Sequence, residues 1–72
     1  MNPQAAKLAR ERANRLYDSM NFADAYCDGA AAARAGRAVT ACPYPKGGRG
    51  WAVPYRRAWI RGYASETATG DT

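Results

Sequence analysis

Residues 40–50 read TACPYPKGGRG, and this segment constrains the fold more than any other part of the sequence. Proline has no backbone N–H to donate and pushes the preceding residue toward extended geometry, so Pro43 and Pro45 exclude a continuous helix. The glycines that follow favour turns. The segment therefore predicts a non-helical connector that divides the chain into two helical parts.

The residues before this connector have the periodicity of helices. Apolar residues recur at helical spacing from Ala5 to Met20. Pro3 after Asn2 is a typical helix start. Asn21 is a suitable cap for a second helix, but the first helix can equally run on. We therefore expect an N-terminal helix that is extended or split in two, and Gly36 is its expected end.

A further helix is predicted after the connector. Pro54 is suited to a first helical turn, and Trp59, Gly62 and Tyr63 share one face of the helix that follows. The small polar residues of 66–72 predict a disordered tail. We find no strand pattern and no internal repeat. The expected fold is all-α: one small domain over residues 1–72, with two main helices joined by a Cys-Pro-Tyr/Gly-rich connector.

The predicted core is thin. A chain of 72 residues buries only about 60% of its unfolded surface. Half of its apolar residues are alanine, so a partner or a second copy, as in a homodimer, is expected to add stability. Gly29 within a helix costs about 1 kcal/mol relative to alanine, which indicates close approach of another backbone.

The basic residues are concentrated in one half of the chain. The net charge is +5, and no acidic residue lies between Gly29 and Ser65. A one-sided positive charge of this kind favours a polyanionic partner such as RNA. Tyr44 and Trp51 either stack on unpaired bases or belong to the core, and the sequence leaves both interpretations open. The candidate RNA-binding residues are Arg34, Arg37, Tyr44, Lys46, Arg49, Trp51, Arg56, Arg57 and Arg61.

No catalytic or metal-binding constellation is predicted. The chain has no histidine, and its two cysteines, Cys27 and Cys42, are too few for a structural zinc site. We interpret them as free thiols rather than a disulfide. The KGGRG sequence lacks the arrangement of a phosphate-binding loop. We therefore expect no enzyme activity, no cofactor and no small-molecule substrate. No membrane span or secretory segment is apparent, which predicts a cytoplasmic protein.

The order of several residues resembles the bacterial ribosome modulation factor family. The similarity runs from Gly29 to about Ala64 and includes Ala35-Gly36-Arg37, Cys42-Pro43-Tyr44 and Trp59-Ile60-x-Gly62-Tyr63. The resemblance implies a small helical protein that binds 16S rRNA of the small ribosomal subunit and promotes ribosome hibernation. It also implies that Arg37, Tyr44 and the arginines of the last helix face rRNA. The residues assigned a structural role are Gly29, Gly36, Cys42, Pro43, Trp59, Gly62 and Tyr63.

The chain also departs from this family. The connector between Tyr44 and Trp59 is longer than in the family, and Tyr63 stands where the family commonly has tryptophan. These departures bear on ribosome dimerisation more than on RNA binding. One alternative is a phage- or plasmid-encoded interaction protein whose basic face binds nucleic acid or an acidic host protein. A weaker alternative is an ATP-dependent, antibiotic-modifying enzyme.

Overall fold

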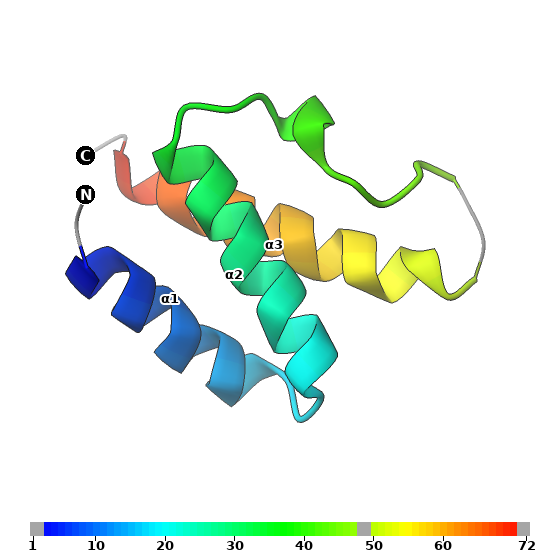
Figure 1. Cartoon of the computed structure of the whole chain (residues 1–72), viewed down its shortest axis with the longest axis horizontal. Coiled ribbons are helices and arrows are strands. Elements are labelled where there is room, and N and C mark those ends of the chain that lie inside the picture. Colours follow the sequence, from blue (N-terminus) through cyan, green and yellow to red (C-terminus); the bar gives the residue numbers. More distant parts are fainter. Residues whose placement is uncertain (1–2, 48–49, 71–72) are drawn as a thin grey trace.

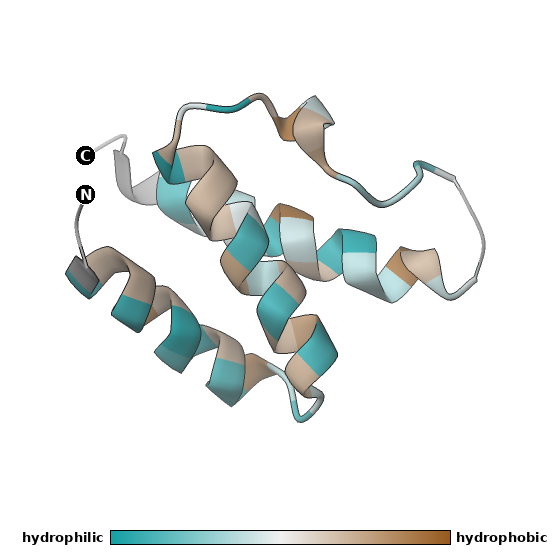
Figure 2. Ribbon diagram, in the orientation of Figure 1, coloured by the Kyte–Doolittle hydropathy of each residue, from teal (hydrophilic) through white to brown (hydrophobic). Residues whose placement is uncertain are grey.

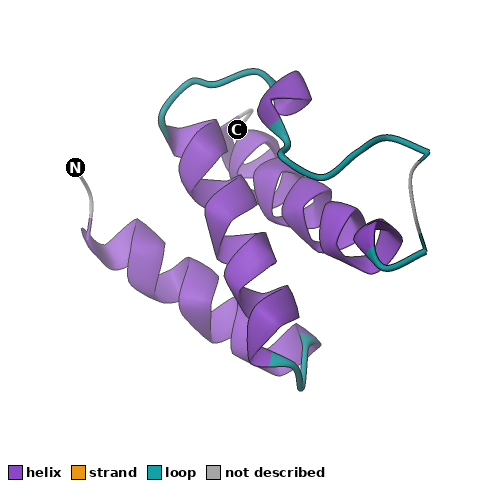
Figure 3. Cartoon of the chain, turned by 45° about the vertical axis from the view of Figure 1, so that its right-hand side comes forward, coloured by secondary structure: helices purple, strands orange, loops and turns teal. Residues whose placement is uncertain are grey.

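In the part of the chain that the structure describes, three α-helices and one short 3₁₀ helix make up the fold (Figures 1 and 3). A computed structural model describes residues 3–47 and 50–70. Helix α1 spans Pro3–Leu16, α2 spans Met20–Arg34, η1 spans Val39–Ala41 and α3 spans Ala52–Gly70. The described residues contain no strand, so the prediction of an all-α fold is confirmed.

The N-terminal helical part is split in two by a tight turn after Leu16. Ser19 has extended backbone angles (φ −80°, ψ 127°) and precedes α2 as its N-cap residue. The expected cap, Asn21, instead lies within the first turn of α2. Helix α1 packs beside α2 through Ala9 and Ala13, which are buried. Figure 2 shows hydrophilic residues along the outer side of α1, as expected for a surface helix.

Helices α2 and α3 run in the same direction. The rings of Phe22 and Tyr55, near the beginnings of the two helices, lie 4.8 Å apart between centroids. Near their ends, Arg34 and Glu66 form an ion pair of 3.5 Å. The chain must therefore return from the end of α2 to the start of α3, and the described residues of this return, 35–47 and 50–51, lie on one side of the molecule (Figure 1). We call residues 35–51 the connector.

Two glycines allow α2 and α3 to cross with their backbones in contact. A Cβ atom on Gly29 would meet the carbonyl oxygen of Trp59, and a Cβ atom on Gly62 would meet the carbonyl oxygen of Tyr26, each at 1.9 Å. No real Cβ atom tolerates so short a contact, so both positions require glycine. Tyr26 and Trp59 are themselves 2% and 3% exposed beside the crossing.

The two halves of this crossing have the same sequence pattern. Phe22, Ala25, Tyr26 and Gly29 in α2 correspond to Tyr55, Ala58, Trp59 and Gly62 in α3, always 33 positions apart. The pattern is aromatic-x-x-Ala-aromatic-x-x-Gly in both helices. The expectation that the chain has no internal repeat is therefore wrong: α2 and α3 repeat one another at the residues where they meet.

The last helix continues into the segment expected to be a tail. Helix α3 ends at Gly70, so residues 66–70 are helical and only 71–72 lie outside the described residues. Glu66 pairs with Arg34, and the Thr67 hydroxyl donates a hydrogen bond of 3.1 Å to the Ala64 carbonyl. These contacts extend the helix beyond the point at which its apolar pattern stops.

Candidate nucleic-acid interface

The connector leaves α2 through a well-defined helix end. Gly36 has a φ of 76°, in the left-handed region that favours glycine. The Gly36 N–H donates to the Ala33 carbonyl at 3.0 Å, and the Arg37 N–H donates to the Ala32 carbonyl at 2.9 Å. This pair of bonds is a Schellman motif, which satisfies carbonyls that the helix leaves open. Gly36 therefore sets the direction in which the connector departs.

Two side chains of α3 hold the connector. The Tyr63 hydroxyl donates a hydrogen bond to the Arg37 carbonyl. The Arg56 guanidinium donates to the Tyr44 carbonyl at 3.1 Å. Each bond fixes a backbone atom rather than a side chain, so the connector has a definite path along α3. Arg56 and Tyr63 lie on the same face of α3, because residues seven apart are separated by about two full turns.

Tyr44 packs within an aromatic cluster. Its ring stacks on Tyr55 at 5.4 Å with an interplanar angle of 24°, and Tyr55 also contacts Phe22. Burial raises the pKa of the Tyr44 hydroxyl. The sequence left open whether Tyr44 stacks on a base or belongs to the core. In the structure one face of its ring packs against Tyr55, so only the rest of the ring is available to a ligand.

Trp51 differs from Tyr44 in its exposure. Its side chain is 63% exposed and meets Tyr55 edge to face, with the centroids 6.3 Å apart. Stacking of a large exposed ring on another flat surface is favourable, because it buries apolar area. Among the connector aromatics, Trp51 is the better candidate for a stacking contact with a base.

The predicted RNA-binding cations fall into three groups. Arg34 and Arg56 are engaged within the fold, through Glu66 and the Tyr44 carbonyl. Arg37 and Lys46 are exposed on the connector, whereas Arg57 and Arg61 are exposed on another side of α3. Arg49 lies outside the described residues. The structure therefore does not bring the predicted cations together on one surface.

A hollow lies beneath the connector. Alanines of α2 line it together with Pro43 and Trp59, and its charged residues are Asp28 and Arg37. Pro43 is exposed, and the half-buried Cys42 donates its N–H to the Val39 carbonyl at 3.2 Å. The Trp59 ring stacks on Tyr63 at 5.5 Å. Trp59 thus connects the helix crossing to the tyrosine that holds the connector.

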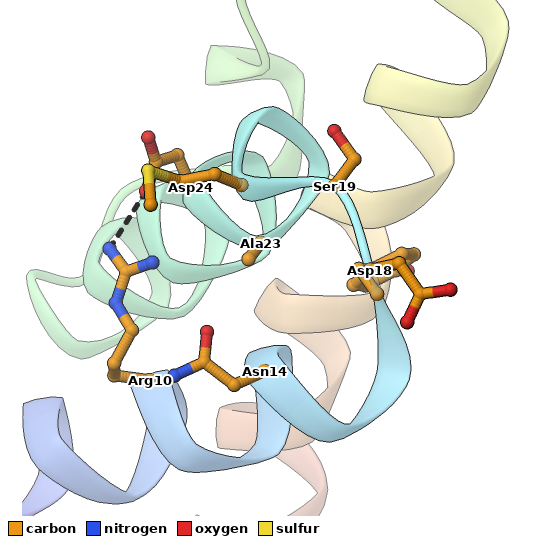
Figure 4. A pocket seen from close by; sticks show the side chains of 8 residues that line it. Arg10, Asn14, Asp18, Ser19, Ala23 and Asp24 are labelled. Carbon is orange, nitrogen blue, oxygen red and sulfur yellow. Dashed lines mark ion pairs between the residues drawn. The ribbon is translucent and has the colours of Figure 1, made fainter.

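A second hollow lies between α1 and the start of α2 (Figure 4). Arg10 and Asp24 pair across it at 2.9 Å. The hydrogen bond with Asp24 raises the pKa of the Arg10 guanidinium, which stays charged at physiological pH. Because Asp24 neutralises Arg10 and a second carboxylate, Asp18, also lines this hollow, it is a less suitable site for a polyanion than the connector.

Both cysteines are free and half-buried. Burial raises the pKa of the Cys27 thiol, which packs against the α1–α2 core. Across residues 3–47 and 50–70, no three metal-ligating side chains lie together. No helix in the same part of the chain combines the length and apolar character needed to span a membrane.

Comparison of the chain with protein-family models, curated proteins and solved structures found no match. The choice of the connector as the candidate nucleic-acid interface therefore depends on the geometry and charge of the connector itself. Sequence reasoning missed the α2–α3 repeat and the two bonds from α3 to the connector. The repeat was visible as a fixed spacing of 33 positions, whereas the two bonds have no signal in the local sequence.

Proposed function

We propose that this protein binds RNA through its connector and acts without catalysis. By its resemblance to ribosome modulation factors, the proposed target is 16S rRNA of the small ribosomal subunit in the cytoplasm. Binding there would obstruct translation or favour ribosome hibernation.

The observation that supports this proposal is the way in which α3 presents the connector. The two hydrogen bonds from Tyr63 and Arg56 fix the connector backbone at Arg37 and Tyr44. The cationic side chains of Arg37 and Lys46 and the ring of Trp51 remain exposed. A fixed backbone with free cations and an exposed ring suits RNA, because phosphate contacts supply affinity and stacking captures unpaired bases.

The connector also permits close approach of a phosphate backbone. Gly47 has a φ of 62° and nothing within 4 Å of its Cβ position. The adjacent Lys46 is exposed. In the proposed complex, RNA phosphates lie along the Arg37–Lys46 side of the connector, and one base stacks on Trp51.

Co-sedimentation with purified small ribosomal subunits tests the proposal. We expect Arg37→Ala combined with Lys46→Ala to weaken binding by about 1–3 kcal/mol, the range for hydrogen bonds to charged groups. The helical circular-dichroism signal should remain, because both residues lie outside the helices.

The matched control is Lys7→Ala combined with Arg15→Ala, which removes the same charge from exposed positions of α1. An equal loss of binding affinity in both double variants would mean that the connector contributes only through the overall positive charge of the protein. No association of the unaltered chain with small subunits or their RNA would refute the proposal.

A further inference from the structure

A groove lies on the side of α3 that does not face the connector. Its lining is Tyr17, the residue that follows α1, together with Pro54, Arg57, Ile60, Arg61 and Ala64 from α3. We call it the α1–α3 groove. Arg56 and Tyr63, which hold the connector, do not line it. The groove and the connector are thus separate surfaces of the molecule.

Two exposed leucines of α1, Leu8 and Leu16, lie away from the hollow that Arg10 and Asp24 close. Arg10 and Asn14 line the hollow beside Met20 and Asp24. On a helix with 100° per residue, Leu8 and Leu16 lie on the opposite side of the buried Ala9–Ala13 line. Leu16 directly precedes Tyr17, which lines the groove, so Leu16 lies next to the groove at this end of α1.

These leucines are unusually exposed for a chain with so few large apolar residues. Leu8 is 51% exposed and Leu16 is 49% exposed, while the core beside them is built from alanine. Helices α1 and α3 have few contacts with each other, because both pack mainly on α2. The leucines of α1 and the apolar lining of the groove, such as Ile60, are therefore left uncovered in the isolated chain.

The charge of the groove is positive. Arg57 and Arg61 are one turn apart and exposed, and neither forms an ion pair with a described residue. None of the residues that line the groove is acidic. By contrast, Asp18 and Asp24 line the hollow on the other side of α1, and Asp28 lies under the connector.

We infer that the α1–α3 groove binds an amphipathic helix of a partner protein, with an apolar stripe and acidic flanks. A helix laid between α1 and α3 buries Leu16 and Ile60, and its carboxylates meet Arg57 and Arg61. RNA would neutralise the arginines but leave the leucines in water. A second copy would bring two positive rims together, because each chain carries +5. This inference goes beyond RNA binding and does not depend on it.

The probe is a fluorescein-labelled peptide of about 18 residues, designed as a helix with a leucine stripe and glutamate flanks. A second peptide has the same stripe with lysine flanks. Fluorescence anisotropy with the full chain should show saturable binding of the glutamate peptide and at least about tenfold weaker binding of the lysine peptide.

Three variants locate the binding. Arg57→Glu combined with Arg61→Glu should weaken binding of the glutamate peptide at least about tenfold, and Leu16→Ser should weaken it about fivefold. Arg37→Glu combined with Lys46→Glu makes the same charge change on exposed positions of the connector and should change the affinity less than about threefold. Unaltered helical circular dichroism and thermal melting in each variant show that the fold is intact.

Three results would each overturn the inference. The first is absence of saturable glutamate-peptide binding up to about 1 mM, or equal binding of the two peptides. The second is binding of an RNA oligonucleotide, but not of the peptide, that is lost in the Arg57→Glu, Arg61→Glu variant. The third is a concentration-dependent dimer in sedimentation equilibrium that Leu16→Ser abolishes. Loss of ribosome binding in the connector variant leaves the inference standing, because that variant keeps the groove.

Discussion

A single methyl group at position 62 would occupy space held by the Tyr26 backbone. The Gly62→Ala substitution places a Cβ atom 1.9 Å from the Tyr26 carbonyl oxygen, and backbone on both sides leaves no flexible neighbour to yield. Overpacking commonly costs about 1–3 kcal/mol, and a clash with backbone belongs at about the upper end of that range, whereas the gain in helix propensity is only about 1 kcal/mol. We expect a net loss of about 2 kcal/mol, seen as a lower midpoint in a thermal melt followed by circular dichroism.

Gly50→Ala is the matched control for this substitution. Nothing lies within 4 Å of the Cβ position of Gly50, and its φ is outside the left-handed region. A surface change of this kind alters stability by less than about 0.5 kcal/mol. If Gly62→Ala melted at or above the temperature of Gly50→Ala, the close crossing of α2 and α3 would be wrong.

The Cys27 thiol is expected to make the stability of the fold decrease at alkaline pH. Burial raises its pKa in the folded state, so the folded protein holds the thiol proton more tightly than the unfolded chain does. The resulting stability is fully present below the unfolded pKa of about 8.5 and is lost as pH rises through the folded pKa. Urea unfolding at pH 7, 8.5 and 9.5 should show a falling midpoint over this range.

The Cys27→Ala variant isolates this effect. It is expected to be less stable at pH 7, because Cys27 packs against the core, but its decline above pH 8.5 should be smaller. Burial also raises the pKa of Tyr44, whose contribution falls only above about pH 10. Identical pH profiles for the two proteins would show that the Cys27 thiol does not contribute.

At the scale of elements, the hydrogen bond from Tyr63 couples α3 to the connector. Tyr63→Phe removes the bond to the Arg37 carbonyl but keeps the ring that stacks on Trp59. We expect a loss of about 0.5–1.5 kcal/mol, the usual net contribution of a hydrogen bond. Amide hydrogen exchange in residues 37–44 should become faster, while exchange at the α2–α3 crossing should change little.

Tyr17→Phe is the control, since the Tyr17 hydroxyl makes no hydrogen bond within the described part of the chain. Equal exchange rates in residues 37–44 of both variants would mean that the Tyr63 hydroxyl does not hold the connector.

The elements themselves were largely predictable, because their signals are local. Pro43 and Pro45 exclude helix, Gly36 ends α2, and apolar periodicity indicates the helices. The common direction of α2 and α3 was not predictable from such signals. It depends on contacts between distant residues, such as Arg34 with Glu66. The same ion pair helps to explain why α3 continues beyond the residues that show apolar periodicity.

The candidate site was predictable only in part, for a related reason. Sequence alone identifies Arg37, Lys46 and Arg56 as cations but does not distinguish a free side chain from an engaged one. The structure uses Arg56 to hold the Tyr44 carbonyl and leaves Arg37 and Lys46 exposed. The excess charge between Gly29 and Ser65 was therefore an upper limit on the number of cations free for RNA.

At the scale of the whole molecule, charge and apolar surface are distributed over two sides. The connector side presents Arg37, Lys46 and the exposed Trp51, and the α1–α3 groove presents Arg57 and Arg61 beside the apolar Ile60. The α2–α3 crossing lies between them and gives both surfaces a rigid base. If both proposals hold, the two sides bind ligands of different chemistry, and substitutions on one side should leave the other side unaffected.

The salt dependence of RNA binding measures how many cations the connector contributes. For a single-stranded target, log affinity falls with log salt by about 0.7 for each phosphate contact. Arg37→Ala combined with Lys46→Ala should therefore lower the slope by about 1.4, because two contacts are removed. Arg57→Ala combined with Arg61→Ala should leave the slope nearly unchanged, because those side chains lie in the groove. The measurement is fluorescence anisotropy with an oligonucleotide from the 3′ end of 16S rRNA over a salt series. A larger drop in slope for the groove variant than for the connector variant would reverse the assignment and make the α1–α3 side the RNA surface.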